Sequence, residues 1–220
     1  MERATHIGSY YNTKRSLYRM SEMRKKLVLS LIPEVSSNIL EIGCGQGELA
    51  QELKNLGHLV TGIDISEEAL KEAKPFLVKS FAFDVDQPWP KDLCNMRFDM
   101  VIASEVIEHL FDTNHFLQQL HGLLHANGSL IITTPNFLFW KNRLKMLLGK
   151  FQYEEKGLLD FGHIRFFTIT TARKKLQENR FKIERETHFY PNLYQRGLNW
   201  LGVLFPGFFA YQMIFLCRKQ

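Results

Sequence analysis

A chain of 220 residues that is 45% hydrophobic and 23% charged is long enough for one domain with a substantial core. The sequence has no low-complexity run and no internal repeat, which excludes fibrous and solenoid architectures. Cys44, Cys94 and Cys217 have neither zinc-ligand spacing nor the pattern of a disulfide framework. Because the N-terminus also lacks an apolar signal core, we expect a reducing, cytoplasmic compartment.

The net charge of +5 is unevenly distributed along the chain. Residues 34–135 contain 15 acids and 6 bases, a net charge of −9, so the two flanks together carry +14. Charge runs are most often solvated surface. A cationic flank also suits an anionic substrate or a membrane surface.

The predicted elements alternate along the chain. Residues 21–32 have the apolar spacing of an amphipathic helix, with Ser21 as its N-cap and Pro33 as its stop. Apolar runs predict strands at 38–42, 59–64, 78–83, 98–103, 128–134, 181–188 and within 210–217. Helical spacing lies near 47–56, 67–74, 114–125 and 169–179. This alternation predicts an α/β fold, doubly wound around a mostly parallel seven-stranded sheet.

Two consecutive predicted strands end in ligand-binding signals. The first runs into three alternating glycines, Gly43, Gly45 and Gly47, and the second ends at Asp64. Glycines in such a turn let the backbone approach a ligand without a Cβ in the way. A carboxylate about 20 residues later suits the two hydroxyls of a ribose. The unit therefore predicts a nucleoside-binding site.

Two acids narrow the choice of nucleoside. Glu48 stands where a dinucleotide fingerprint has glycine or alanine, and Glu41 comes just before the first glycine. Carboxylates there would repel a pyrophosphate and would favour a ligand that carries a cation. S-adenosylmethionine has an adenosine, a sulfonium and an ammonium but no phosphate, so the sequence predicts this methyl donor rather than NAD.

Four segments resemble the motifs of one protein family and follow each other in that family's order: 41–47, 62–65, 83–85 and 98–110. Over roughly residues 38–190 the chain resembles class I S-adenosylmethionine-dependent methyltransferases. The resemblance implies that Asp64 holds the ribose hydroxyls, Ile65 packs on the adenine, and Asp84 and Val85 flank its amino edge. It also implies that Gly43 and Gly45 bind the cofactor, that Ser104 contacts the methionine end through its backbone, and that Glu41 balances the ammonium.

Glu105, Glu108 and His109 form an E-x-x-E-H pattern at an expected helix start, where positions i, i+3 and i+4 share one face. His163 is a possible fourth metal ligand. The pattern resembles small-RNA 2′-O-methyltransferases and ubiquinone-biosynthesis O-methyltransferases, some of which use magnesium. Acids at a helix start are also favoured by the helix dipole alone, and the further histidine of the RNA enzymes is not evident. We therefore predict no metal requirement.

Methyl transfer to a hydroxyl needs a base that takes the proton, and histidine is the usual choice. His163 and His109 are the candidate catalytic residues. An insertion at 136–167, after the fifth strand, is expected to form a substrate cap, and residues 1–33 a helical lid. Arg165 could hold an anion of the acceptor. The cap interleaves aromatic residues with the cations Lys141, Arg143, Lys145, Lys150, Lys156 and Arg165.

The segments 133–136, 162–168 and 208–212 resemble small bacterial methyltransferases that act on cell-surface glycans or lipid-linked intermediates. We therefore predict one domain over 1–220, an O-methyltransferase acting on a small polar, sugar or lipid-linked acceptor that we expect to be anionic. A metal-dependent RNA 2′-O-methyltransferase and a non-catalytic cofactor-binding module stay open. Residues 197–217 carry no charge and predict a loop and a buried strand. A membrane span and an interfacial patch at Trp200, Leu201, Leu204 and Phe205 are the alternatives.

Overall fold

The computed structural model describes residues 20–155, 157–191 and 199–220. These residues build a seven-stranded sheet with the order β3-β2-β1-β4-β5-β7-β6. Only the β5–β7 and β6–β7 pairs are antiparallel. The predicted doubly wound, mostly parallel sheet is therefore confirmed. The strands are β1 (Asn38–Ile42), β2 (Leu59–Asp64), β3 (Lys79–Ala82), β4 (Phe98–Ser104), β5 (Leu124–Pro135), β6 (Phe181–Phe189) and β7 (Gln212–Lys219).

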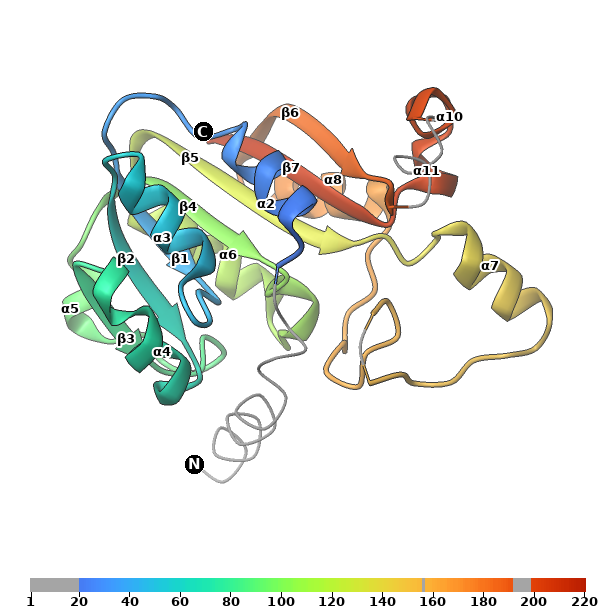
Figure 1. The fold of residues 1–220 in the computed structure, drawn as a ribbon, viewed down its shortest axis with the longest axis horizontal. Helices are drawn as coiled ribbons and strands as arrows, with labels where there is room; N and C mark the ends of the chain where they lie inside the picture. The colour runs from blue at the N-terminus through green and yellow to red at the C-terminus, as the bar shows by residue number, and fades with distance from the viewer. Residues whose placement is uncertain (1–19, 156, 192–198) are drawn as a thin grey trace.

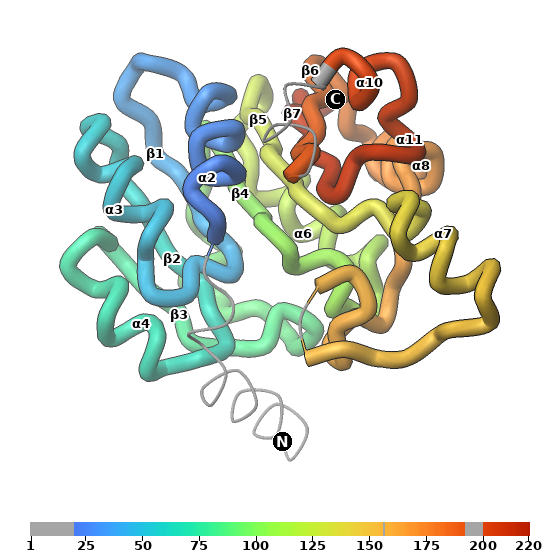
Figure 2. Tube along the Cα trace, turned by 45° about the vertical axis from the view of Figure 1, so that its right-hand side comes forward, coloured from blue at the N-terminus to red at the C-terminus, as the bar shows by residue number. Residues whose placement is uncertain are grey.

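Helices cover both faces of the sheet, as Figures 1 and 2 show. The central strands alternate accordingly: Met100 and Ile102 pack in the cluster under α2 and α3, whereas Val101 and Ala103 pack in the cluster under α6 and α8. The helices are α2 (Glu22–Leu29), α3 (Glu48–Asn55), α4 (Glu67–Ala73), α5 (Lys91–Cys94), α6 (Thr113–Leu123), α7 (Trp140–Leu147), α8 (Ile169–Glu178), α10 (Asn199–Leu204) and α11 (Pro206–Phe209).

Short polar side chains set where the helices begin. The side chain of Ser21 accepts a hydrogen bond at the start of α2, Ser66 does so at α4 and Asp112 at α6. Thr168 forms a capping box with Thr171 at α8. These caps turn the chain back along the sheet directly after β2 and the β4 loop. As a result, the loops between strands and helices gather at one edge of the sheet.

The parallel register brings the predicted ligand residues to that edge. Ile42 pairs with Ile63 on one side and with Ala103 on the other. Gly43, Asp64 and Ser104 therefore leave the sheet at the same level. Ligands bind at this carboxyl edge in doubly wound folds, so the sheet itself positions the candidate site.

The structure corrects one expectation about the E-x-x-E-H pattern. Instead of starting an α-helix, Ile107–His109 forms a single 3₁₀ turn, η3, and α6 begins only at Thr113. Glu105 has a positive φ of 56°, which is uncommon outside glycine. The side chains of Glu105 and Glu108 therefore do not share a helical face. The two side chains contact different neighbouring residues.

Two segments are more structured than the sequence indicates. The insertion at 136–167 contains α7, and the uncharged stretch before the last strand contains the short helices α10 and α11. The last strand itself, predicted within 210–217, is β7. Among the described residues, every helix is too short or too polar to cross a membrane. Most of the predicted lid at 1–33 lies outside the described residues, and α2 is its described part.

Candidate active site

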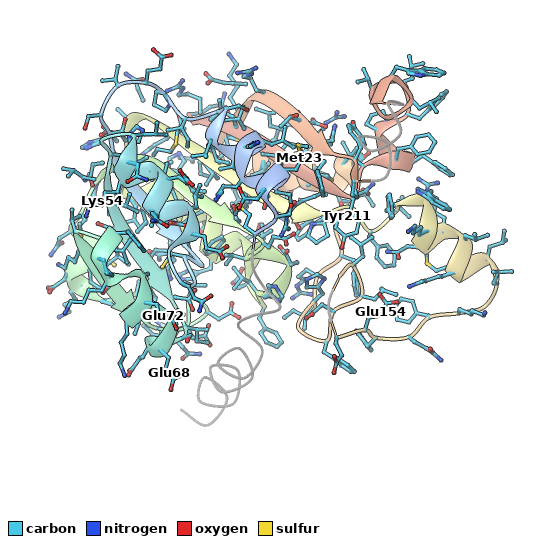
Figure 3. All side chains as sticks on the ribbon, viewed as in Figure 1. Met23, Lys54, Glu68, Glu72, Glu154 and Tyr211 are labelled. Carbon is cyan, nitrogen blue, oxygen red and sulfur yellow. The ribbon has the colours of Figure 1, made fainter. Side chains whose placement is uncertain are left out.

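A cavity of about 1020 Å³ opens at the carboxyl edge of β1, β2 and β4. Its floor is the glycine loop and the ends of these strands, and its far wall comes from the cap and from Tyr211, which directly precedes β7. Figure 3 shows Tyr211 and Glu154, both lining residues, on the cap side, whereas Glu68 and Glu72 of α4 lie on the opposite side. The volume is large enough for a nucleoside cofactor together with a second molecule.

The glycine loop is shaped by positive backbone φ angles and by Asp64. Gly43 has a φ of 72°, and a Cβ there would come within 2.8 Å of the Val106 side chain. Gly45 has nothing within 4 Å of its Cβ position, so its backbone faces open space. Asp64 accepts hydrogen bonds from the Gly45 and Ser66 amides, both at 2.8 Å. Each carboxylate oxygen of Asp64 can accept a second hydrogen bond, so the side chain can still bind the two hydroxyls of a ribose.

Glu41 is a buried acid beneath the glycine loop. It is only 4% exposed, and its Oε2 has no hydrogen-bond partner among the described residues. Burial, and secondarily the charge of Asp64, raise the pKa of Glu41 to about 8. Burial likewise raises the pKa of Asp64, against the hydrogen bonds from backbone amides. Two acids held this way favour a ligand that brings positive charge.

The predicted adenine and methionine contacts also line the cavity. Ile65, Asp84, Val85 and Ser104 are all lining residues. The Asp84 Oδ2 and Ser104 Oγ atoms are buried without a hydrogen-bond partner in the described part of the chain. Burying such atoms costs free energy unless a ligand or a water molecule supplies the missing hydrogen bond. With Glu41 they form three unpartnered acceptor oxygens around one cavity.

These features fit S-adenosylmethionine. The amino group of the adenine and the ammonium of the methionine are donors for unpartnered oxygens, and the sulfonium suits an acidic floor. Asp64 would hold the ribose, and the Gly43–Gly45 turn provides the close backbone approach. The fold and the site together define a class I S-adenosylmethionine-dependent methyltransferase.

Comparison with known proteins gives the family. The methyltransferase domain family matches residues 11–186, so the chain belongs to it. A ubiquinone biosynthesis O-methyltransferase of Bradyrhizobium diazoefficiens is 32% identical over 158 residues, 68% of this chain and 60% of that protein. The mitochondrial human protein of that name is 38% identical over 126 residues, 53% of this chain and 32% of its own length. The chain thus spans 60% or less of these two relatives.

Solved structures confirm the fold. The magnesium protoporphyrin IX methyltransferase of Synechocystis, with bound S-adenosylhomocysteine, matches with a TM-score of 0.63 at 19% identity. The match covers 99% of this chain and 86% of the other. A methyltransferase from Archaeoglobus fulgidus matches with a TM-score of 0.66 at 18% identity, covering 96% and 99% of the two chains.

Three possible metal ligands come together on the cap side of the cavity. One ligand atom each from Glu108, His109 and His163 lies within 4.8 Å of the others. His109 Nδ1 lies 2.9 Å from the Gly162 carbonyl oxygen, and His163 Nδ1 lies 3.2 Å from that of Leu158. Because a carbonyl oxygen only accepts, Nδ1 is the nitrogen that carries the proton in the neutral form of each ring. Each Nε2 therefore keeps a lone pair.

The protonation of this cluster follows from its burial. Burial, and next the charge of His163, lower the pKa of His109 to about 4, so this ring is neutral at pH 7. Burial, together with the nearby charge of Glu105, raises the pKa of Glu108 well above its usual range. Both Glu108 carboxylate oxygens lack a hydrogen-bond partner among the described residues.

Glu105 is directed away from the cluster. Its carboxylate forms an ion pair with Arg24 of α2 and accepts a hydrogen bond from Gln212 of β7. Gln212 also donates to the Thr133 hydroxyl at 3.3 Å. Of the four residues that the sequence offered as possible metal ligands, three come together in this structure. The residues that hold Glu105 come from distant parts of the sequence, and no local pattern marks them.

The predicted cap residues divide into two groups. Lys141 and Lys145 line the cavity, and Lys145 forms an ion pair with Glu154. Arg165 is not a lining residue, since its guanidinium donates to the Phe111 carbonyl oxygen at 2.6 Å. Lys156 lies outside the described residues. Sequence reasoning missed the lining residues Arg24, Phe111 and Tyr211, which stand in unremarkable sequence surroundings.

Proposed function

We propose that the protein transfers the methyl group of S-adenosylmethionine to a hydroxyl oxygen of a small polar, sugar or lipid-linked acceptor. The observation that carries the proposal is the pair of lone-pair-bearing Nε2 atoms of His109 and His163 in the cavity wall. They lie beyond the predicted cofactor residues, where an acceptor would sit. The relatives named as O-methyltransferases support a hydroxyl acceptor.

The bound cofactor would supply an activated methyl group on a sulfonium, whose thioether is an excellent leaving group. Transfer moves the methyl from sulfur to the acceptor oxygen while the hydroxyl proton goes to a base. We assign the proton to Nε2 of His163, since the low pKa of His109 makes that ring a weak base. His109 would help to orient His163 through their ring contact. The rest of the protein's contribution to catalysis is to position the acceptor and to exclude water.

The acceptor side of the cavity combines aromatic and cationic groups. Phe139, Phe161, Phe189 and Tyr211 line it, together with Lys141 and Lys145. Aromatic faces suit an apolar or sugar ring, and the lysines suit a carboxylate or phosphate. We therefore propose an anionic acceptor. The three cysteines are free, in keeping with the expected cytoplasmic compartment, and a lipid-linked acceptor would bring the protein to the membrane periphery.

A second candidate is metal-assisted transfer, as in an RNA 2′-O-methyltransferase. It is favoured by the convergence of Glu108, His109 and His163 within 4.8 Å. One carboxylate and two imidazoles fit a divalent cation, and backbone carbonyls fix both rings as expected for metal-bound histidine. These residues would hold the ion, which would supply Lewis-acid polarisation of the acceptor oxygen. The ion pair between Glu105 and Arg24 argues against metal-assisted transfer.

Tritiated methyl transfer into separated lipid, glycan, RNA and small-molecule fractions of a cell extract tests the proposal. We expect label in a lipid, glycan or small-molecule fraction, and much less label with the Asp64→Ala variant when S-adenosylmethionine is limiting. Label confined to RNA would replace the proposal with the second candidate. Cofactor binding without label in any fraction would favour a non-catalytic binding module.

A further inference from the structure

Three short segments at one end of the molecule expose large apolar side chains. At the end of α7, Leu147 is 83% exposed, and Leu148, the C-cap residue, is 62% exposed. On α10 and just after it, Val203 is 73%, Leu204 62% and Phe205 58% exposed. Trp200 and Phe208 add to this set, whereas Leu201 of the predicted patch packs inward against Tyr190 and Ala210. Side chains of this size are normally covered or functional when they gather.

The segments are neighbours in space. Figures 1 and 2 both show α7, α10 and α11 at the end of the molecule away from α3 and α4. Arg143 of α7 donates to the Gly207 carbonyl oxygen at 3.2 Å and lies over the Phe208 ring at 5.5 Å. One cation thus joins α7 to α11. We call α7, α10, α11 and the adjoining exposed residues 148–151 and 205 the apolar end.

The charge of the apolar end has one sign. Residues 137–153 contain four cations, Lys141, Arg143, Lys145 and Lys150, and no acid, and residues 199–217 contain no charged residue at all. Leu144 and Leu147 of α7 and the C-cap residue Leu148 stand at the i, i+3 and i+4 spacing of one face, and Lys141 lies one turn before them. Apolar side chains flanked by lysine and arginine suit the interface of an anionic bilayer.

A second copy of the chain fits this surface less well. In a two-fold dimer each patch would meet itself, so Lys141, Arg143 and Lys150 would face the same cations of the other copy. Acids that could offset them are absent from the described part of the apolar end. An anionic lipid surface instead provides both an apolar layer and opposite charge.

The apolar end also adjoins the cavity. Asn142 and Lys145 of α7 line the cavity, whereas Leu147 at the end of the same helix and the C-cap residue Leu148 are exposed and outside its lining. A single helix therefore separates the acceptor side from the outer surface. We infer that the apolar end docks on an anionic membrane and presents the cavity to acceptors held in it. The inference deepens the proposed function and rests on it for the acceptor, although docking itself can be measured without methyl transfer.

Vesicle cosedimentation of the full chain tests the docking. We expect wild-type protein to bind vesicles of phosphatidylglycerol and phosphatidylcholine in equal parts, and to bind pure phosphatidylcholine much more weakly. Leu147→Glu combined with Val203→Glu should weaken binding to the anionic vesicles at least about tenfold, since both side chains would enter the interface. High salt should weaken wild-type binding as well.

The matched control is Val35→Glu combined with Leu56→Glu, which places the same two new charges at residues that are 75% and 56% exposed and lie outside the apolar end. Its vesicle binding should equal that of wild type. Unchanged melting temperature and S-adenosylhomocysteine affinity would show that the double variant is folded.

Wild-type protein that ignores anionic vesicles, or a double variant that binds like wild type, would overturn docking. If the wild type is a dimer and the double variant is a monomer, the apolar end is instead the interface between two copies of the chain. Vesicle binding without label in the lipid fraction would retain the docking and remove the membrane-held acceptor.

Discussion

The imidazole rings of His109 and His163 meet edge to face, with 4.8 Å between their centroids, although 53 residues separate them in the chain. The contact links the β4 loop to the cap. It is reinforced by the backbone amides of Ile164 and Arg165, which both donate to the Glu108 carbonyl oxygen. The cap is therefore attached to the cofactor half of the cavity at the two histidines that we propose to face the acceptor hydroxyl.

The His163→Ala variant is expected to lower the turnover number about 10²- to 10⁴-fold, the usual contribution of a general base. Cofactor affinity should stay unchanged. The loss should shrink at high pH, where the acceptor hydroxyl ionises without help. The matched control is His115→Ala, an exposed histidine of α6, which should leave turnover at the wild-type value. Stopped assays across a pH series measure this, and a normal turnover number in folded His163→Ala would remove His163 as the base.

The Asp64→Ala variant should weaken S-adenosylmethionine binding by about 1.5–3 kcal/mol, the range for charge-assisted hydrogen bonds. The loss has two sources in the structure, since Asp64 both faces the cavity and holds the Gly45 amide. Titration calorimetry with S-adenosylmethionine and with NADH measures the effect. Equal cofactor affinity in the variant, or binding of NADH by wild type, would contradict the assignment.

Glu41 predicts how pH affects the cofactor-free protein. Its pKa rises from 4.5 to about 8 in the folded state, so between these values the folded protein keeps a proton that the unfolded chain has lost. Glu41 therefore lowers the free energy of unfolding as pH rises from about 4.5 to about 8. Above that range its effect on the free energy of unfolding is constant. Glu41→Gln should remove this part of the slope in thermal melts.

The same group predicts a proton linkage in binding. An ammonium near Glu41 favours its ionised form, so S-adenosylmethionine binding should release a proton near pH 7 and tighten as pH rises towards about 8. Calorimetry in buffers of different ionisation enthalpy measures the proton. Identical pH dependence of affinity in wild type and Glu41→Gln would show that Glu41 does not face the cation.

Much of the cofactor half could be predicted because its signals are local. The bounds of β1 and β2 agree with the predicted strands, since an apolar run ends at a glycine in one case and at an acid in the other. All eight predicted cofactor residues line the cavity, because parallel strands bring their carboxyl ends to one edge. Their individual contacts with the cofactor stay predictions.

The acceptor half was less predictable because its geometry depends on distant partners. Phe139 precedes α7 without a side-chain cap, so the sequence carries no signal for the start of that helix. The left-handed backbone of Glu105 accompanies contacts with Arg24 and Gln212, 81 and 107 residues away. A pattern of acids at i and i+3 indicates a helical face, and nothing local shows that the first acid turns elsewhere.

Methyl transfer is expected to survive chelation by EDTA. Glu105, the fourth possible ligand, is paired with Arg24, and Glu108 has a raised pKa that favours its protonated form, so an ion would have to displace a proton. Activity assays after EDTA treatment and back-addition of magnesium, manganese or zinc measure this. Loss of activity with rescue by one metal, abolished in Glu108→Gln, would establish the second candidate function instead.

The last prediction concerns Arg165, for which the sequence suggested contact with an acceptor anion. In the structure the Phe111 carbonyl oxygen accepts from Arg165, and the Phe111 amide donates to both carboxylate oxygens of Asp86 at 3.1 Å. Phe111 lines the cavity on the same side as Asp84 and Val85, the predicted adenine contacts. Arg165 therefore braces one wall of the cofactor site from outside.

We expect Arg165→Ala to weaken S-adenosylhomocysteine binding about threefold to tenfold, because Phe111 would lose one of the hydrogen bonds that hold it. The Michaelis constant for the acceptor should change little once cofactor is saturating. Lys174→Ala, which removes an exposed cation from the C-terminal half of α8, is the control and should bind cofactor normally. Calorimetry and two-substrate kinetics separate the two roles. Unchanged cofactor affinity with a raised acceptor Michaelis constant, relieved at high salt, would return Arg165 to acceptor binding.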